Sequence, residues 1–190
     1  MKMNRLLAAL MALVLLPFAA LAQSEPTATN ADSKPYVLNA FEGTTLDLTQ
    51  YKGKAIWLNF FTGWCPYCMT EMPYIKQVFD EYDPNEVAII LVHVWDGENA
   101  DDSKKVIEKF GLQDMTMVED QDKTLAGLVG LSGYPTSIFI DKQGYLHTGA
   151  YGLEYKAMVQ YMEELGVAKR VTAINSATVT ATETPAATTP

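Results

Sequence analysis

Two nearly continuous apolar segments, residues 55–61 and 87–94, constrain the fold of this chain more than any other feature. Continuous apolar runs of this length are typical of strands that are covered on both faces. Between them, apolar residues recur every three or four positions from Cys65 to Tyr82, which is the spacing of an amphipathic helix. A buried strand, a helix and a second buried strand predict a parallel pair within an α/β sheet.

The flanking segments extend this sheet. Further helices are expected at about 101–110, 123–131 and 153–165, and further strands at about 115–118, 136–140 and 145–151. The short turn before residue 145 makes the last two strands antiparallel neighbours. Residues 36–38 and 45–48 flank Glu42-Gly43 and are interpreted as a β-hairpin. The predicted fold is therefore α/β, a central mixed sheet with helices on both faces and an N-terminal β-hairpin extension.

The N-terminal residues have the pattern of an export signal. Lys2 and Arg5 precede an apolar run that ends in the small-residue pattern of residues 20–22. We expect residues 1–22 to be a signal peptide, with an uncleaved membrane anchor as the alternative. In either case the folded part is expected to be periplasmic or otherwise extracytoplasmic.

The segments beside the folded part are polar. Residues 23–35 are interpreted as a flexible linker and the Thr/Ala-rich residues 171–190 as a disordered tail, which leaves 36–170 as the domain. The formal net charge of −9 argues against nucleic acid as a partner.

Cys65 and Cys68 are the only cysteines, and they lie where the first buried strand gives way to the helix. A disulfide across so short a loop removes little entropy from the unfolded chain, so a purely structural role is disfavoured. Free N–H groups at a helix start stabilise a thiolate, and Pro66 suits the first turn. We expect a reversible Cys65–Cys68 disulfide, with Cys65 attacking a substrate disulfide and Cys68 resolving the mixed disulfide.

A Cys-x-x-Cys motif can also be half of a zinc site, which needs two further ligands. The chain offers only His93 and His147, each alone within a predicted strand. We therefore expect neither a metal nor another cofactor.

Four segments carry a family resemblance: residues 57–61, 62–68, 71–73 and 133–141. Together they resemble the thioredoxin superfamily, and within it the TlpA/ResA-like extracytoplasmic thiol–disulfide oxidoreductases. The resemblance implies that Pro135 follows a cis peptide bond and faces the cysteines, leaving the Tyr134 backbone free to pair with a substrate peptide. From sequence alone, a trans proline at the start of a strand is the alternative.

The residues around the cysteines gain roles from this resemblance. Trp64, Pro66 and Tyr67 are interpreted as substrate-binding residues at the rim of a groove, although packing on the helix end explains the two aromatic residues equally well. TlpA/ResA-like members are similar in placing a glutamate three residues after the second cysteine, here Glu71. We expect it to be a catalytic base for Cys68, and the alternative is an exposed carboxylate beside Lys76.

The resemblance implies a reductase that keeps cysteines of exported proteins reduced, for instance in cytochrome c maturation. Its partners would be protein disulfide or dithiol substrates and a membrane-embedded electron donor. The alternatives are a DsbA-like dithiol oxidase or isomerase, and a non-catalytic binding module with a thioredoxin fold.

Overall fold

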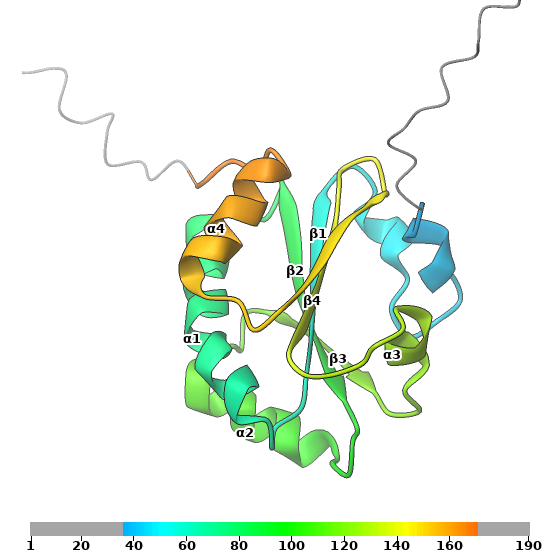
Figure 1. Cartoon of the computed structure of the whole chain (residues 1–190), viewed down its shortest axis with the longest axis vertical. Helices are drawn as coiled ribbons and strands as arrows, with labels where there is room; N and C mark the ends of the chain where they lie inside the picture. Colours follow the sequence, from blue (N-terminus) through cyan, green and yellow to red (C-terminus); the bar gives the residue numbers. More distant parts are fainter. Residues whose placement is uncertain (1–35, 171–190) are drawn as a thin grey trace, which may run out of the picture. The chain divides into compact units, whose positions relative to one another are not determined.

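The computed structural model describes residues 36–170, which form one five-stranded mixed sheet with helices on both faces (Figure 1). The predicted signal peptide, linker and tail lie outside the described residues. Within the described part of the chain, no helix is long and apolar enough to cross a membrane. In chain order, the strands and α-helices are β1 (Ala55–Phe61), α1 (Pro66–Glu81), β2 (Val87–Val94), α2 (Ala100–Phe110), β3 (Thr116–Asp120), α3 (Thr124–Leu128), β4 (Thr136–Ile140), β5 (Leu146–Tyr151) and α4 (Tyr155–Glu164).

The strand order in the sheet is β3-β2-β1-β4-β5, so the two apolar strands lie at its centre. β1 pairs in parallel with β2 and antiparallel with β4. Both central strands have the bounds that the sequence predicts, because burial on both faces gives each an apolar run with sharp ends. The predicted α/β fold with a mixed sheet is confirmed.

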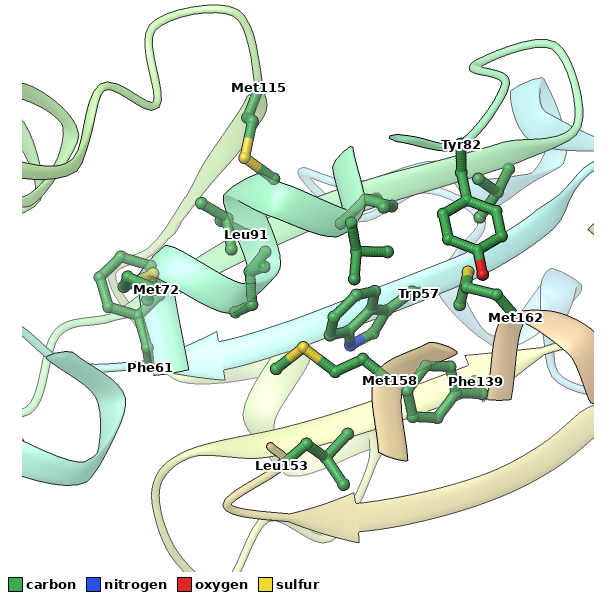
Figure 2. Close-up of a cluster of buried hydrophobic side chains, with 14 of the residues drawn as sticks. Trp57, Phe61, Met72, Tyr82, Leu91, Met115, Phe139, Leu153, Met158 and Met162 are labelled. Atoms are coloured by element: carbon green, nitrogen blue, oxygen red, sulfur yellow. The ribbon is translucent and has the colours of Figure 1, made fainter. Parts of the chain in front are cut away.

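Alternate residues of β1 contribute to two separate cores. Trp57 and Phe61 face α1, α2 and α4 in a core that also contains Met72, Phe139 and Met158, and Figure 2 shows these side chains together. The other face of β1 packs against α3 and the segment that precedes β1. The buried residues of this second core include Ile56, Leu58, Phe60, Leu38 and Leu125.

The predicted N-terminal β-hairpin is wrong. The segment forms two 3-10 helices, η1 (Leu38–Phe41) and η2 (Leu48–Tyr51), and Tyr36 bridges to Tyr145 instead of pairing within a hairpin. The spacing of Leu38 and Phe41 by three buries both side chains on one side of a 3-10 turn. This segment therefore covers a face of the sheet and adds no strand to it.

Candidate active site

The cysteine pair lies at the start of α1, directly after the loop that leaves β1. Cys65 is the N-cap residue of the helix, and its Sγ accepts a hydrogen bond from the backbone N–H of Cys68 at 3.2 Å. Pro66 occupies the first turn, where its missing N–H costs no hydrogen bond. Both cysteines are free and buried in this structure. The helix start thus directs the backbone N–H of Cys68 at the sulfur that we expect to attack.

The two sulfurs differ in their surroundings. Cys65 retains 3% of its surface exposed, whereas Cys68 is fully buried. Burial raises the pKa of the Cys68 thiol, and the nearby Cys65 thiol raises it further, while the backbone N–H of Thr62 opposes the rise. Cys68 is therefore held as a thiol and needs a base before it can act as a nucleophile.

Glu71 lies one helical turn beyond Cys68 and is 2% exposed. One carboxylate oxygen accepts a hydrogen bond from the Leu153 backbone N–H at 2.7 Å, and the other from Asn59 Nδ2 at 3.0 Å. Burial raises the pKa of Glu71, against the opposing effect of these two donors. The alternative of an exposed carboxylate beside Lys76 is excluded, because Lys76 pairs with Asp80 and Glu71 faces the interior.

Sequence reasoning missed a serine that completes this buried network. Ser137 Oγ on β4 accepts hydrogen bonds from Trp57 Nε1 at 2.8 Å and from Asn59 Nδ2 at 3.2 Å. The Asn59 Oδ1 atom has no protein partner although it is fully buried. β1 and β4 are paired with Asn59 opposite Ser137, so the sheet register brings these side chains together.

The residues around the entrance come from the loop before α1, from the first turn of α1 and from the loop before β4. Tyr67 is 76% and Trp64 55% exposed, and the Trp64 ring packs edge-on against Tyr134 with 6.0 Å between the ring centroids. The predicted cis peptide bond between Tyr134 and Pro135 is confirmed. Substrate binding by Trp64, Pro66, Tyr67, Tyr134 and Pro135 stays a prediction.

A cleft of about 310 Å³ lies beside the loop before Cys65, between the start of α1 and α2. It is lined by Trp64 of the loop before α1, by Met69 of α1, and by residues of α2 that include Lys105, Val106 and Lys109. No group of three or more His, Cys, Asp or Glu side chains among residues 36–170 is arranged to hold a metal ion. The chemistry that this arrangement supports is thiol–disulfide exchange at Cys65, followed by resolution by Cys68.

The fold and the cysteine pair define a thioredoxin-like thiol–disulfide oxidoreductase. The chain belongs to the AhpC/TSA family, whose model matches residues 29–148. It is 36% identical to the thiol–disulfide oxidoreductase ResA of Geobacillus thermodenitrificans over 62% of this chain and 66% of that protein. With ResA of Bacillus thuringiensis it is 29% identical over 87% of this chain and 99% of that protein.

A solved structure with the same fold is the exposed lipoprotein thioredoxin Etrx1 of Streptococcus pneumoniae. It matches with a TM-score of 0.52 and 26% identity, over 61% of this chain and 88% of that one. The resemblance to ResA-like thioredoxins is confirmed.

Proposed function

We propose that this chain works outside the cytoplasm as a reductase of disulfides in exported proteins. The observation that carries the proposal is the buried carboxylate of Glu71, held one turn from Cys68 by Asn59 and the Leu153 N–H. A raised carboxylate pKa suits a group that takes a proton from a thiol and later returns it. The likeness to ResA proteins and to an exposed lipoprotein thioredoxin supports a location outside the cytoplasm.

The first step of the mechanism uses the sulfur at the helix start. Cys65 attacks as a thiolate one sulfur of a substrate disulfide, a Cys65–substrate disulfide forms, and the other substrate sulfur leaves as a thiolate. The N–H of Cys68 that points at Cys65 Sγ stabilises negative charge on this sulfur. Tyr134, next to Pro135, presents its backbone to the substrate peptide, and Trp64 and Tyr67 contact it at the rim.

The second step needs the base. Glu71 takes the thiol proton of Cys68, which attacks Cys65 Sγ, so that the Cys65–Cys68 disulfide forms and the second substrate thiolate leaves. Glu71 then releases its proton to the departing thiolate through solvent. Two electrons pass from the cysteine pair to the substrate, and a membrane-embedded dithiol donor restores the dithiol form.

Asn59 fits both protonation states of Glu71 in this mechanism. With Glu71 ionised, Asn59 Nδ2 donates to the carboxylate. Once Glu71 carries the proton, rotation of the amide turns the unpartnered Oδ1 toward it, and Oδ1 accepts from the carboxylic acid. The buried amide therefore offers a partner before and after the proton transfer.

The direction of electron flow is tested by the reduction potential of the pair. A reductase of this kind should have a potential at or below about −200 mV, in the range of glutaredoxins and thioredoxin. A value near that of DsbA, about −120 mV, would make the chain an oxidant and overturn the proposal. A failure to accelerate insulin reduction by dithiothreitol would favour a binding module.

The partner and the base are tested with two variants. Cys68→Ser should trap the exported substrate in a disulfide with Cys65, visible on non-reducing gels of the native compartment.

Glu71→Gln should slow the resolving step about 100-fold or more, the range for loss of a general base. Glu108→Gln, which changes an exposed carboxylate on α2, is the matched control. Cytochrome c maturation is the pathway in which we expect the trapped substrate to act.

A further inference from the structure

A buried carboxylate holds the loop that precedes the attacking cysteine. Glu98, in the loop between β2 and α2, has an 8% exposed side chain. Its Oε2 accepts a hydrogen bond from the backbone N–H of Gly63 at 2.8 Å. Gly63 stands two residues before Cys65, so this bond fixes the backbone just ahead of the sulfur.

Position 63 leaves little room for a side chain beside this contact. A Cβ atom built on Gly63 would lie 2.6 Å from Glu98 Oε1, well inside the normal contact distance. A side chain at position 63 would therefore require the Glu98 carboxylate to shift. The absence of a side chain at Gly63 allows the Glu98 carboxylate to approach the backbone N–H closely.

A buried histidine contacts the Glu98 carboxylate. His93 on β2 is fully buried, and its Nε2 lies 3.2 Å from Glu98 Oε2. Its Nδ1 lies 2.7 Å from an oxygen of Glu119 on β3, a carboxylate that also accepts hydrogen bonds from Trp95 Nε1 and Ser103 Oγ. The imidazole ring thus bridges two carboxylates, and in its protonated form it donates to both.

The same loop also holds Trp64 by its side chain. Trp64 Nε1 donates to the Asp96 carbonyl at 3.0 Å, and Asp96 is fixed in turn by an ion pair with Lys123 at 2.6 Å. Both residues that precede Cys65, Gly63 and Trp64, are therefore tied to residues 96–98. A hydrogen-bonded path runs from the far edge strand β3 to the segment that presents the sulfur.

We propose that Glu98 and His93 are positioning residues that hold Gly63 and hence Cys65 in the geometry for attack on a disulfide. The inference rests on the thiol–disulfide exchange proposed above. Attack requires the three sulfur atoms to align, and a displacement of about 1 Å can cost about 100-fold in rate. In this role both residues act on Cys65 through the backbone of Gly63.

The test measures the rate at which the reduced protein attacks a small aromatic disulfide, with Cys68→Ser as the common background so that only Cys65 reacts. Glu98→Ala removes the acceptor of the Gly63 N–H and should slow the reaction about 10- to 100-fold. Glu98→Gln retains a carbonyl acceptor for that N–H and should stay within about twofold of the parent. Glu108→Gln again serves as the control.

A second readout follows the Gly63 amide directly by NMR. In Glu98→Ala its proton should move upfield and exchange faster with solvent, whereas Glu98→Gln should keep both properties. His93→Leu removes the group behind Glu98 and should affect the rate and the amide in the same direction as Glu98→Ala. Glu119 keeps the Trp95 and Ser103 donors in that variant, so its carboxylate stays hydrogen-bonded.

The outcomes separate this inference from the proposed function. A parent protein that fails to attack the disulfide would contradict the function itself. An active parent, with Glu98→Ala and His93→Leu reacting at its rate, would overturn the positioning role alone. Equal slowing of Glu98→Ala and Glu98→Gln would also overturn it, because the lost charge would then explain the effect. If Glu98→Ala does not fold, the positioning role is tested by the rate of attack and the Gly63 amide signal of Glu98→Gln and His93→Leu.

Discussion

Ser137 offers a quantitative test of the network behind the cysteines. Its Oγ is the hydrogen-bond acceptor of the fully buried Trp57 indole N–H, at 2.8 Å. Ser137→Ala leaves that N–H without its partner in a site that water does not reach. A buried donor left unsatisfied costs about 1–3 kcal/mol, whereas Asn59 Nδ2 keeps Glu71 as its acceptor.

The loss is measurable by urea unfolding. With a slope of about 2 kcal/mol per molar urea, the midpoint of Ser137→Ala should fall by about 0.5–1.5 M. Ser132→Ala is the matched control, since Ser132 is exposed and bonds the Tyr151 hydroxyl at the surface. That change should alter the free energy of unfolding by no more than about 0.5 kcal/mol.

A double-mutant cycle with Trp57→Phe isolates the contact. Phenylalanine has no indole N–H, so Ser137→Ala should cost much less in the Trp57→Phe background than in the wild type. A coupling energy of about 1–2 kcal/mol is expected between the two positions. An equal loss in both backgrounds would refute the reasoning, because the cost would then come from packing at Ser137 and not from the orphaned donor.

Three further predictions concern ionisable groups. Burial raises the folded-state pKa of Glu71. The wild type should therefore lose stability relative to Glu71→Gln as the pH rises from about 4.5 through that raised pKa. Urea unfolding of both proteins over a pH series measures this difference in the free energy of unfolding. Asn59→Leu removes a hydrogen-bond donor that lowers the pKa of Glu71. The pH at which the rate of the resolving step falls on the acid side should therefore rise in this variant. An unchanged pH dependence of that rate would contradict the effect of Asn59 on Glu71. Hydrogen bonds from Lys169, Tyr155 and Gln77 lower the pKa of Glu81 to about 2. Its stabilising effect, under about 1 kcal/mol at this partly exposed site, should be present above pH 4.5 and vanish as the pH falls through about 2, as a comparison with Glu81→Gln would show.

The central strands and the cysteine site could be predicted because their signals are local. β1 and β2 are buried on both faces, which leaves an apolar run with defined ends in the sequence. Cys65, Cys68 and Glu71 lie within two helical turns, so their spacing alone places them together. The burial of Glu71 excludes the alternative of an exposed carboxylate, and its role as a base for Cys68 stays a prediction.

The N-terminal segment misled because short apolar runs around a turn suit both a hairpin and 3-10 turns. Asp47 decides in favour of the latter, since its side chain caps η2 through the Thr49 N–H.

The parts of the site that sequence reasoning missed are distant in the chain. Ser137 lies 80 residues from Trp57, and the Leu153 N–H lies 82 residues from Glu71. Only the pairing of β1 with β4, and the loop that enters α4, bring them to the cysteines.

The two cysteines are served by separate buried networks, and this separation has a chemical reason. The attacking sulfur needs a fixed direction of approach, which the bond between Glu98 and Gly63 supplies from the β2–α2 loop. The resolving sulfur needs a proton acceptor, the role proposed above for Glu71 of α1. A single carboxylate could not serve both, because a base must change its protonation state during turnover while a positioning group must keep its own. The exchange at Cys65 and the resolution by Cys68 should therefore be separable by mutation: Glu98→Ala slows the first step and Glu71→Gln the second.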